Sequence, residues 1–95
     1  MNLQSVRTPA RDPREPVSHL LDPLRLGDRE ITVSLTVRLA EDGAWRGRIA
    51  FLETDAPLAV RETAEIFCAD TEDELWQGVQ RLRDHHFRDL FRSLS

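Results

Sequence analysis

Residues 31–39 alternate strictly between apolar and polar side chains. The apolar positions are Ile31, Val33, Leu35, Val37 and Leu39, and the polar positions between them are Thr32, Ser34, Thr36 and Arg38. A period of two, with β-branched residues, is typical of a strand that buries one face and exposes the other. This segment therefore predicts a sheet with one apolar face, and it is the strongest constraint on how the 95 residues can fold.

A second strand is expected over residues 44–53, and burial selects its register. A two-residue turn at Asp42-Gly43 would set Leu39 opposite Arg46. A three-residue loop, with Glu41 added, instead sets apolar residues opposite one another, because a shift by one residue exchanges the two faces. The resulting pairs are Leu39 with Trp45, Val37 with Gly47, Leu35 with Ile49 and Val33 with Phe51. Gly43 supplies the left-handed conformation that the last position of such a loop requires.

A third strand is predicted over residues 60–69, after a connection at residues 54–59. Its core face is expected to carry Val60, Ala64, Ile66 and Cys68. Its outer face is expected to carry Arg61, Thr63, Glu65, Phe67 and Ala69.

One long C-terminal helix is predicted to begin at the capping box Thr71-Glu-Asp-Glu74. The Thr hydroxyl and the Glu carboxylate of such a box each accept a free backbone N–H, and acids in the first turn complement the helix dipole. Helical spacing produces a first apolar stripe at Leu75, Val79, Leu82, His86 and Leu90. A second stripe, about 100° away around the helix, consists of Trp76, Phe87, Phe91 and Leu94.

The N-terminal part of the chain has two sections. Residues 1–17 contain three prolines among charged and polar residues, and they predict a disordered or extended tail. Residues 18–27 predict a short helical turn, with Asp22 as its cap, Pro23 in its first position and Gly27 at its end. This section also carries four leucines, which we expect to dock on the domain or on a second copy of it.

The expected fold is α+β. Residues 18–95 would form a single small domain, in which a three-stranded antiparallel β-meander packs on one long C-terminal helix and a short helical turn precedes the sheet. A core of this size gives the folded monomer only marginal stability, which favours a dimer.

The two helical stripes together span an apolar arc that is wider than one small sheet needs. Trp and Phe are frequent anchors of protein interfaces. We therefore expect a small non-enzymatic interaction module, either a homodimer or a protein that binds a protein partner. The expected partner-binding residues, the aromatic flank of the helix, are Trp76, Phe87, Phe91 and Leu94. Coverage of this flank by residues 20–26 of the same chain is the alternative.

An alternative function is anion or nucleic-acid binding through the outer face of the hairpin, where Arg38, Arg46 and Arg48 lie together. Arg38 would face Arg46, and opposed like charges are mildly destabilising. Pairing with Glu65 and Glu53 would offset this repulsion. Every one of the 13 basic residues is Arg, but 17 acids bring the net charge to −4, which disfavours polyanionic partners.

Catalytic and metal-binding patterns are not evident in the sequence. His85 and His86 point about 100° apart on a helix, and a zinc site needs three or four ligands, so no metal and no cofactor is expected. Cys68 is expected to be a small buried apolar residue. A single cysteine excludes an intramolecular disulfide, and neither a signal peptide nor an apolar run of about 18 residues is present. These features favour the cytoplasm and no membrane partner.

Overall fold

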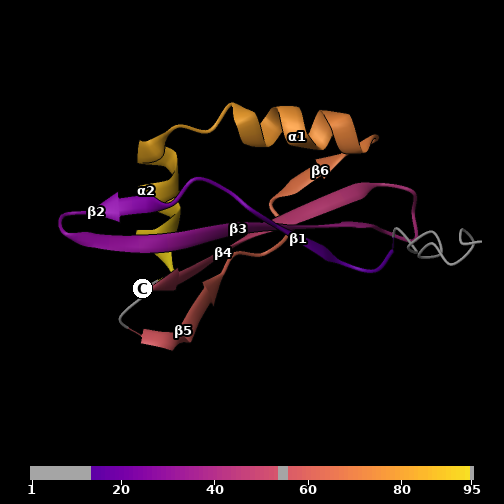
Figure 1. Ribbon diagram of the computed structural model, residues 1–95. Coiled ribbons are helices and arrows are strands. Elements are labelled where there is room, and N and C mark those ends of the chain that lie inside the picture. Colours follow the sequence, from indigo (N-terminus) through magenta and orange to yellow (C-terminus); the bar gives the residue numbers. More distant parts are fainter. Residues whose placement is uncertain (1–13, 54–55, 95) are drawn as a thin grey trace, which may run out of the picture.

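The computed structural model describes residues 14–53 and 56–94. These residues form six strands in one antiparallel sheet together with two helices (Figure 1). The elements in chain order are β1 (Val17–Leu20), β2 (Leu24–Leu26), β3 (Arg29–Leu39), β4 (Trp45–Glu53), β5 (Ala56–Glu62), β6 (Phe67–Ala69), α1 (Glu72–Gln80) and α2 (Asp84–Ser93). The predicted three-stranded meander on one long helix is therefore wrong, because β1 and β2 add a further edge to the sheet, the predicted third strand is split into β5 and β6, and the helix is divided.

The β3–β4 hairpin has the register that burial predicted. Val33 pairs with Phe51, and Leu39 pairs with Trp45. The loop closes where the Ala40 N–H donates to the Ala44 carbonyl at 2.7 Å, and Gly43 has a φ of +87°. The three-residue loop and its left-handed glycine are therefore confirmed.

Each edge of the sheet is built from two short strands. On one edge β1 and β2 both pair with β3, and on the other edge β5 and β6 both pair with β4. The first edge is interrupted between Leu20 and Leu24, where Pro23 has no N–H to donate to a ladder. The sheet is therefore four strands wide.

The predicted helical turn over residues 18–27 is wrong. Leu24 pairs with Ile31 and Leu26 pairs with Arg29, so residues 24–26 form a strand. Gly27 has a φ of +66° in the turn that joins this strand to β3, and it does not end a helix. The alternation of buried Leu24, exposed Arg25 and half-buried Leu26 is the strand signal in this segment. Of the predicted tail, residues 1–13 lie outside the described residues, and Val17 already belongs to β1.

The predicted third strand is wrong in extent and in its faces. Residues 63–66 interrupt it opposite β4, and Phe67 pairs with Gly47 on the far side of the interruption. Phe67 and Ala69 pack against the core, whereas Val60 is 55% exposed, Ile66 is 47% exposed and Cys68 is exposed. Phe67, the largest side chain of the segment, occupies the core side opposite Gly47, so its neighbours Ile66 and Cys68 face outward.

The predicted single helix is divided between Gln80 and Asp84. The N–H groups of Arg81 and Leu82 donate to carbonyls only three residues back, which ends α1, and Arg83 is extended. At the start of α1, Thr71 accepts the Glu74 N–H at 3.1 Å, so the predicted N-cap is confirmed.

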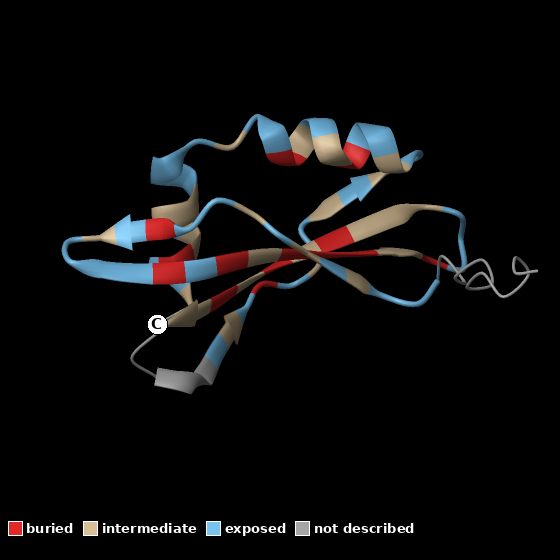
Figure 2. Ribbon diagram, viewed as in Figure 1, coloured by how far each residue is buried: buried red, intermediate tan, exposed pale blue. Residues whose placement is uncertain are grey.

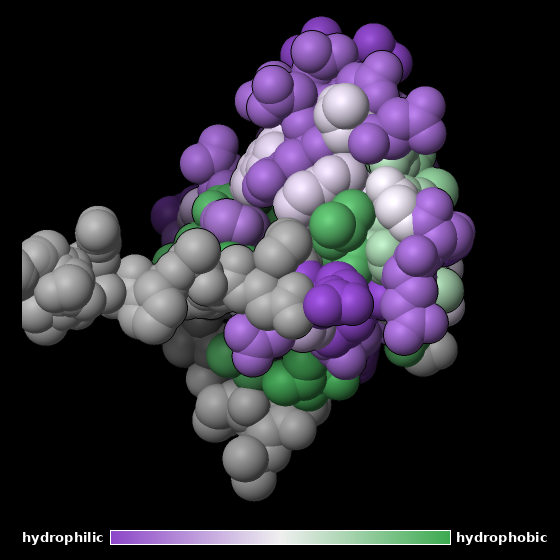
Figure 3. Space-filling model, turned by 90° about the vertical axis from the view of Figure 1, so that its right-hand side faces the viewer, coloured by the Kyte–Doolittle hydropathy of each residue, from purple (hydrophilic) through white to green (hydrophobic). Residues whose placement is uncertain are grey.

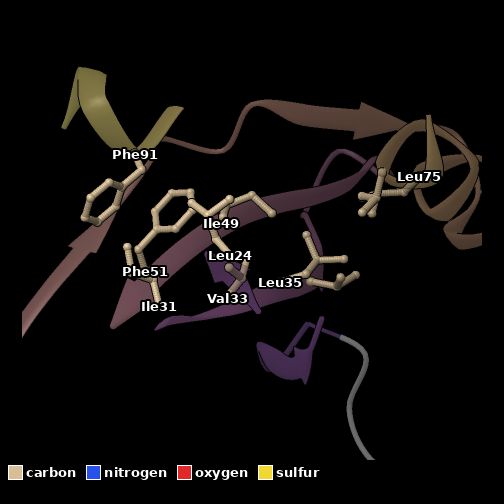
Figure 4. Packing of buried hydrophobic residues seen from close by; sticks show 10 residues of the cluster. Leu24, Ile31, Val33, Leu35, Ile49, Phe51, Leu75 and Phe91 are labelled. Atoms are coloured by element: carbon tan, nitrogen blue, oxygen red, sulfur yellow. The ribbon is translucent and has the colours of Figure 1, made fainter. Parts of the chain in front are cut away.

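The division follows from the position of the core. Buried residues lie along β3 and β4 and on the side of α1 that faces the sheet (Figure 2). Leu75 lies at one end of this core and Phe91 lies at the other, near Phe51 (Figure 4). Two helices in different directions reach both ends of the twisted sheet. Neither helix in the described part of the chain is long and apolar enough to cross a membrane.

Candidate functional site: an aromatic groove

A groove of about 490 Å³ lies between the β1/β2 edge of the sheet and the two helices. We call it the aromatic groove. Its lining residues are Leu20, Leu21, Asp22, Pro23, Leu24, Trp76, Val79, Gln80, Leu82, Asp84 and Phe87. Two residues of the predicted aromatic flank, Trp76 and Phe87, line it.

Trp76 forms one wall of the groove and is held in place from two sides. Its indole Nε1–H donates to the Glu72 carboxylate at 3.3 Å, one helical turn earlier. The His19 ring from β1 meets it edge to face, with ring centroids 5.1 Å apart. Because both contacts orient the half-buried indole, its remaining surface is presented to the groove in a defined position.

Phe87 and Leu24 bring α2 and β2 to the groove. Phe87 is half-buried. Leu24 is only 4% exposed, so the aliphatic base of the groove belongs to the core. Val79 of α1 is 5% exposed and completes this base. The base of the groove is therefore apolar.

Two carboxylates, Asp22 and Asp84, lie among the lining residues, and both are exposed. Asp84 is the first residue of α2, and Asp22 stands between β1 and β2. Among the described residues that line the groove, none carries a positive charge. The groove thus combines an apolar base and two aromatic side chains with an acidic rim.

The predicted aromatic flank is separated into two parts. Trp76 and Phe87 reach the groove, but Phe91 is 3% exposed and belongs to the core. The Phe91 ring meets the Phe51 ring at 5.3 Å between centroids, and the Arg61 guanidinium carbon lies 4.7 Å from its centroid. Leu94 also packs against the core. Residues 20–24 run beside the flank, so the same chain covers part of it and leaves the groove between.

The three arginines of the outer face each have a carboxylate partner. Arg38 donates from Nε and Nη2 to both oxygens of Glu65, at 2.6 and 2.7 Å. Arg46 contacts Asp42 at 2.9 Å, and Arg48 contacts Glu62 at 3.3 Å. Of the predicted pairing of these arginines with Glu65 and Glu53, the part that involves Glu65 is confirmed. Glu53 instead lies 2.6 Å from Arg29 and 3.9 Å from Arg61.

These pairs shift the pKa values of the groups concerned. The Arg38 hydrogen bonds lower the pKa of Glu65, and the Glu65 carboxylate raises the pKa of Arg38. The pKa of Asp42 is lowered by the Ala44 N–H and by Arg46. The charges of this face are therefore satisfied within the chain, which leaves little demand for an external anion.

The paired histidines, His85 and His86, lie in the first turn of α2. Their rings are 4.0 Å apart, and His86 Nδ1 accepts the Arg83 N–H at 2.9 Å, which caps α2. His86 is exposed, so its predicted place at the edge of the core is wrong. Within residues 14–53 and 56–94, no group of three or more His, Cys, Asp or Glu side chains could hold a metal ion.

The acidic rim is the part of the site that sequence reasoning missed. Asp22 and Asp84 are far apart in the chain, and the local sequence around each contains no recognisable binding motif. Only the packing of the β1–β2 connection beside the start of α2 brings both to one groove.

Comparisons with protein-family models, with curated proteins and with solved structures find no match to this chain.

Proposed function

We propose that the protein is a non-enzymatic interaction module whose aromatic groove binds a segment of a protein partner. The segment would insert an apolar side chain between Trp76 and Phe87 and present a basic side chain to the acidic rim. The observation that carries this proposal is the position of these two aromatic residues, half-buried on opposite helices around one hollow.

The energetics of the groove support a peptide-like occupant. Aromatic residues contribute large contact area with few rotatable bonds, which is why they dominate interface energetics. The groove volume accommodates one or two side chains rather than a whole helix. Because Trp76 is already oriented by Glu72 and His19, a ligand loses little further free energy in ordering it.

The negative charge of the rim favours a basic side chain in the partner segment, next to the apolar one. Asp22 and Asp84 contribute two negative charges without a basic residue among the described lining. A guanidinium or ammonium group would pair with these carboxylates and could also lie over an aromatic face. An acidic segment would be repelled.

A fluorescence titration tests the proposal. The variant Trp45→Phe leaves Trp76 as the only tryptophan and therefore as the reporter. It would be titrated with a capped leucine–arginine peptide and with its leucine–glutamate counterpart. We expect the first peptide to change the Trp76 emission saturably and the second to bind at least about tenfold more weakly.

Variants connect the signal to the groove. Phe87→Ala should weaken binding of the leucine–arginine peptide by about tenfold. Asp84→Asn should weaken it by about threefold to tenfold. Asp89→Asn is the matched control, because Asp89 lies exposed on the same helix outside the groove. Absence of saturable binding by either peptide contradicts the proposed function, whereas equal binding of both contradicts only the role of the rim.

We also propose the cytoplasm as the site of this function. The proposal depends on the single cysteine, which cannot form a disulfide within the chain.

A further inference from the structure

β1 is an edge strand that runs into the aromatic groove. Among the described residues it pairs with no strand other than β3. The outer side of such a strand presents N–H and C=O groups that the sheet itself does not use, and another extended backbone can pair with them. Leu20, the last residue of β1, is also one of the lining residues of the groove. The open edge and the groove therefore adjoin.

The hydrogen bonds to β3 identify the backbone groups of β1 that point outward. The Leu21 N–H donates to the Val33 carbonyl at 2.9 Å, and the same register continues backward along β1. Bonded positions alternate along an antiparallel pair, so the odd-numbered residues of β1 direct their backbone groups to β3. The N–H and C=O groups of Ser18 and Leu20 therefore point away from the sheet.

The helix side of β1 is the side of its odd-numbered residues. The His19 ring meets the Trp76 ring, and Leu21 packs against the core. The outer surface of α1 is hydrophilic (Figure 3), so this helix takes part through Trp76, on its side toward β1. Directly opposed residues of neighbouring strands project to the same face. Every second side chain of a strand added to β1 would therefore point toward the helices.

An extended segment also suits the dimensions of the groove. The groove has a volume of about 490 Å³, which holds one or two side chains but not a whole helix. In a strand, side chains two residues apart project to the same face, about 7 Å from each other. An apolar side chain and a basic side chain at this spacing would both reach the helix side, where the groove and its acidic rim lie.

We infer that the partner segment binds in an extended conformation, as a short strand added antiparallel to β1. The inference rests on the proposed function of the aromatic groove and adds the conformation of the partner. Main-chain hydrogen bonds to Ser18 and Leu20 supply affinity, while the groove receives alternate side chains. The contact is short, because Pro16 and Pro23 on either side of β1 have no N–H. Antiparallel pairing matches every strand pair of the described sheet.

Backbone methylation of a peptide tests the inference. The peptide is a capped heptamer with a central leucine, an arginine two residues away on each side and threonine elsewhere, and Trp76 of the Trp45→Phe protein reports its binding. Methylation of the backbone nitrogens of both threonines next to leucine should raise the Kd at least about tenfold, because these N–H groups donate to β1. The matched control methylates both arginine nitrogens, which point away from β1, and should change the Kd less than about twofold.

Ser18→Pro tests the same contact from the side of the protein. Proline removes the outward N–H but leaves the bonds between β1 and β3, because an edge strand accepts proline where its N–H faces outward. We expect the Kd of the unmethylated peptide to rise at least about fivefold. Ser18→Ala is the matched control, because it also loses the 3.0 Å contact with the Thr36 hydroxyl but keeps the N–H. Circular dichroism of both variants confirms that the fold is intact, and the methylated peptides test the inference without either variant.

The outcomes separate this inference from the proposed function. If the two methylated peptides bind with equal affinity, the inference is overturned, while saturable binding of the unmethylated peptide still supports the proposed function. A loss of binding on arginine methylation instead of threonine methylation overturns the antiparallel arrangement. Absence of binding by the unmethylated peptide overturns both the inference and the proposed function.

Discussion

The Phe91 ring of α2 meets the Phe51 ring of β4 edge to face, with centroids 5.3 Å apart. Both side chains are nearly fully buried, at 3% and 1% exposure. This contact attaches the C-terminal helix to the end of the hairpin that α1 does not reach. It also changes the role of Phe91 from a predicted partner-binding residue to a structural one.

Replacement of Phe91 by alanine should therefore destabilise the fold strongly. We expect Phe91→Ala to lower the free energy of unfolding by about 3–5 kcal/mol, through lost burial and the cavity that remains. Chemical denaturation measures the loss. Phe87→Ala is the control, because Phe87 is half-buried at the groove, and it should cost clearly less. Equal losses in the two variants would show that Phe91 does not anchor the helix.

Gly47 provides space for the side chains that join α1 to the sheet. A Cβ atom there would lie 3.2 Å from Leu35 Cδ1 and 3.4 Å from Leu75 Cδ2, and both leucines are buried. Gly47→Val should therefore destabilise the protein by about 1–3 kcal/mol through overpacking.

A second glycine serves as the control for this prediction. At Gly78 the nearest atom to an added Cβ is Phe67 Cδ1 at 4.0 Å, so the space is open. Gly78→Ala should stabilise α1 by up to about 1 kcal/mol, the difference in helix propensity. Thermal unfolding of both variants should give shifts of opposite sign, and a Gly47→Val protein as stable as the wild type contradicts the packing described.

The Arg38–Glu65 pair should make stability depend on pH in the acid range. Because Arg38 lowers the pKa of Glu65 in the folded state, the pair stabilises the fold above the unfolded value of 4.5. That contribution is lost as the pH falls through the lowered folded pKa.

The corresponding measurement compares the Tm of wild type and Glu65→Gln between about pH 7 and about pH 3. The wild type should have the higher Tm at neutral pH, and the difference should shrink in acid. Glu62→Gln should show a smaller difference, since Glu62 makes a longer contact of 3.3 Å and its side chain is 48% exposed. If the Tm difference between wild type and Glu65→Gln stays constant from about pH 7 to about pH 3, the Arg38–Glu65 pair is not the source of the pH dependence.

The start of α1 depends on the Thr71 side chain. Loss of its hydrogen bond from the Glu74 N–H in Thr71→Ala should cost about 0.5–2 kcal/mol of stability. Thr71→Ser keeps the hydroxyl and should recover most of the loss. If Thr71→Ser is as unstable as Thr71→Ala in chemical denaturation, the cap is not the source of the effect.

The predictable parts of the site are the aromatic side chains, because the residue type and the helical spacing of each already indicate a surface for a partner. Trp76 and Phe87 were expected on a surface for partners, and both line the groove. The acidic rim was not predictable, because Asp22 and Asp84 come together only through packing. The exposure of Val60 was also missed, since Val60 was assigned to the core with Ala64, Ile66 and Cys68.

The sequence by itself determined the local elements of this protein. The alternation of residues 31–39 and the loop at Gly43 set the hairpin register, and Thr71 set the start of the first helix, because each depends on neighbours within a few residues. Tertiary structure decided where the helix divides and which side of residues 60–69 is buried. Those choices depend on the twist of the sheet and on the space beside Gly47, which belong to residues distant in the chain and leave no periodic pattern.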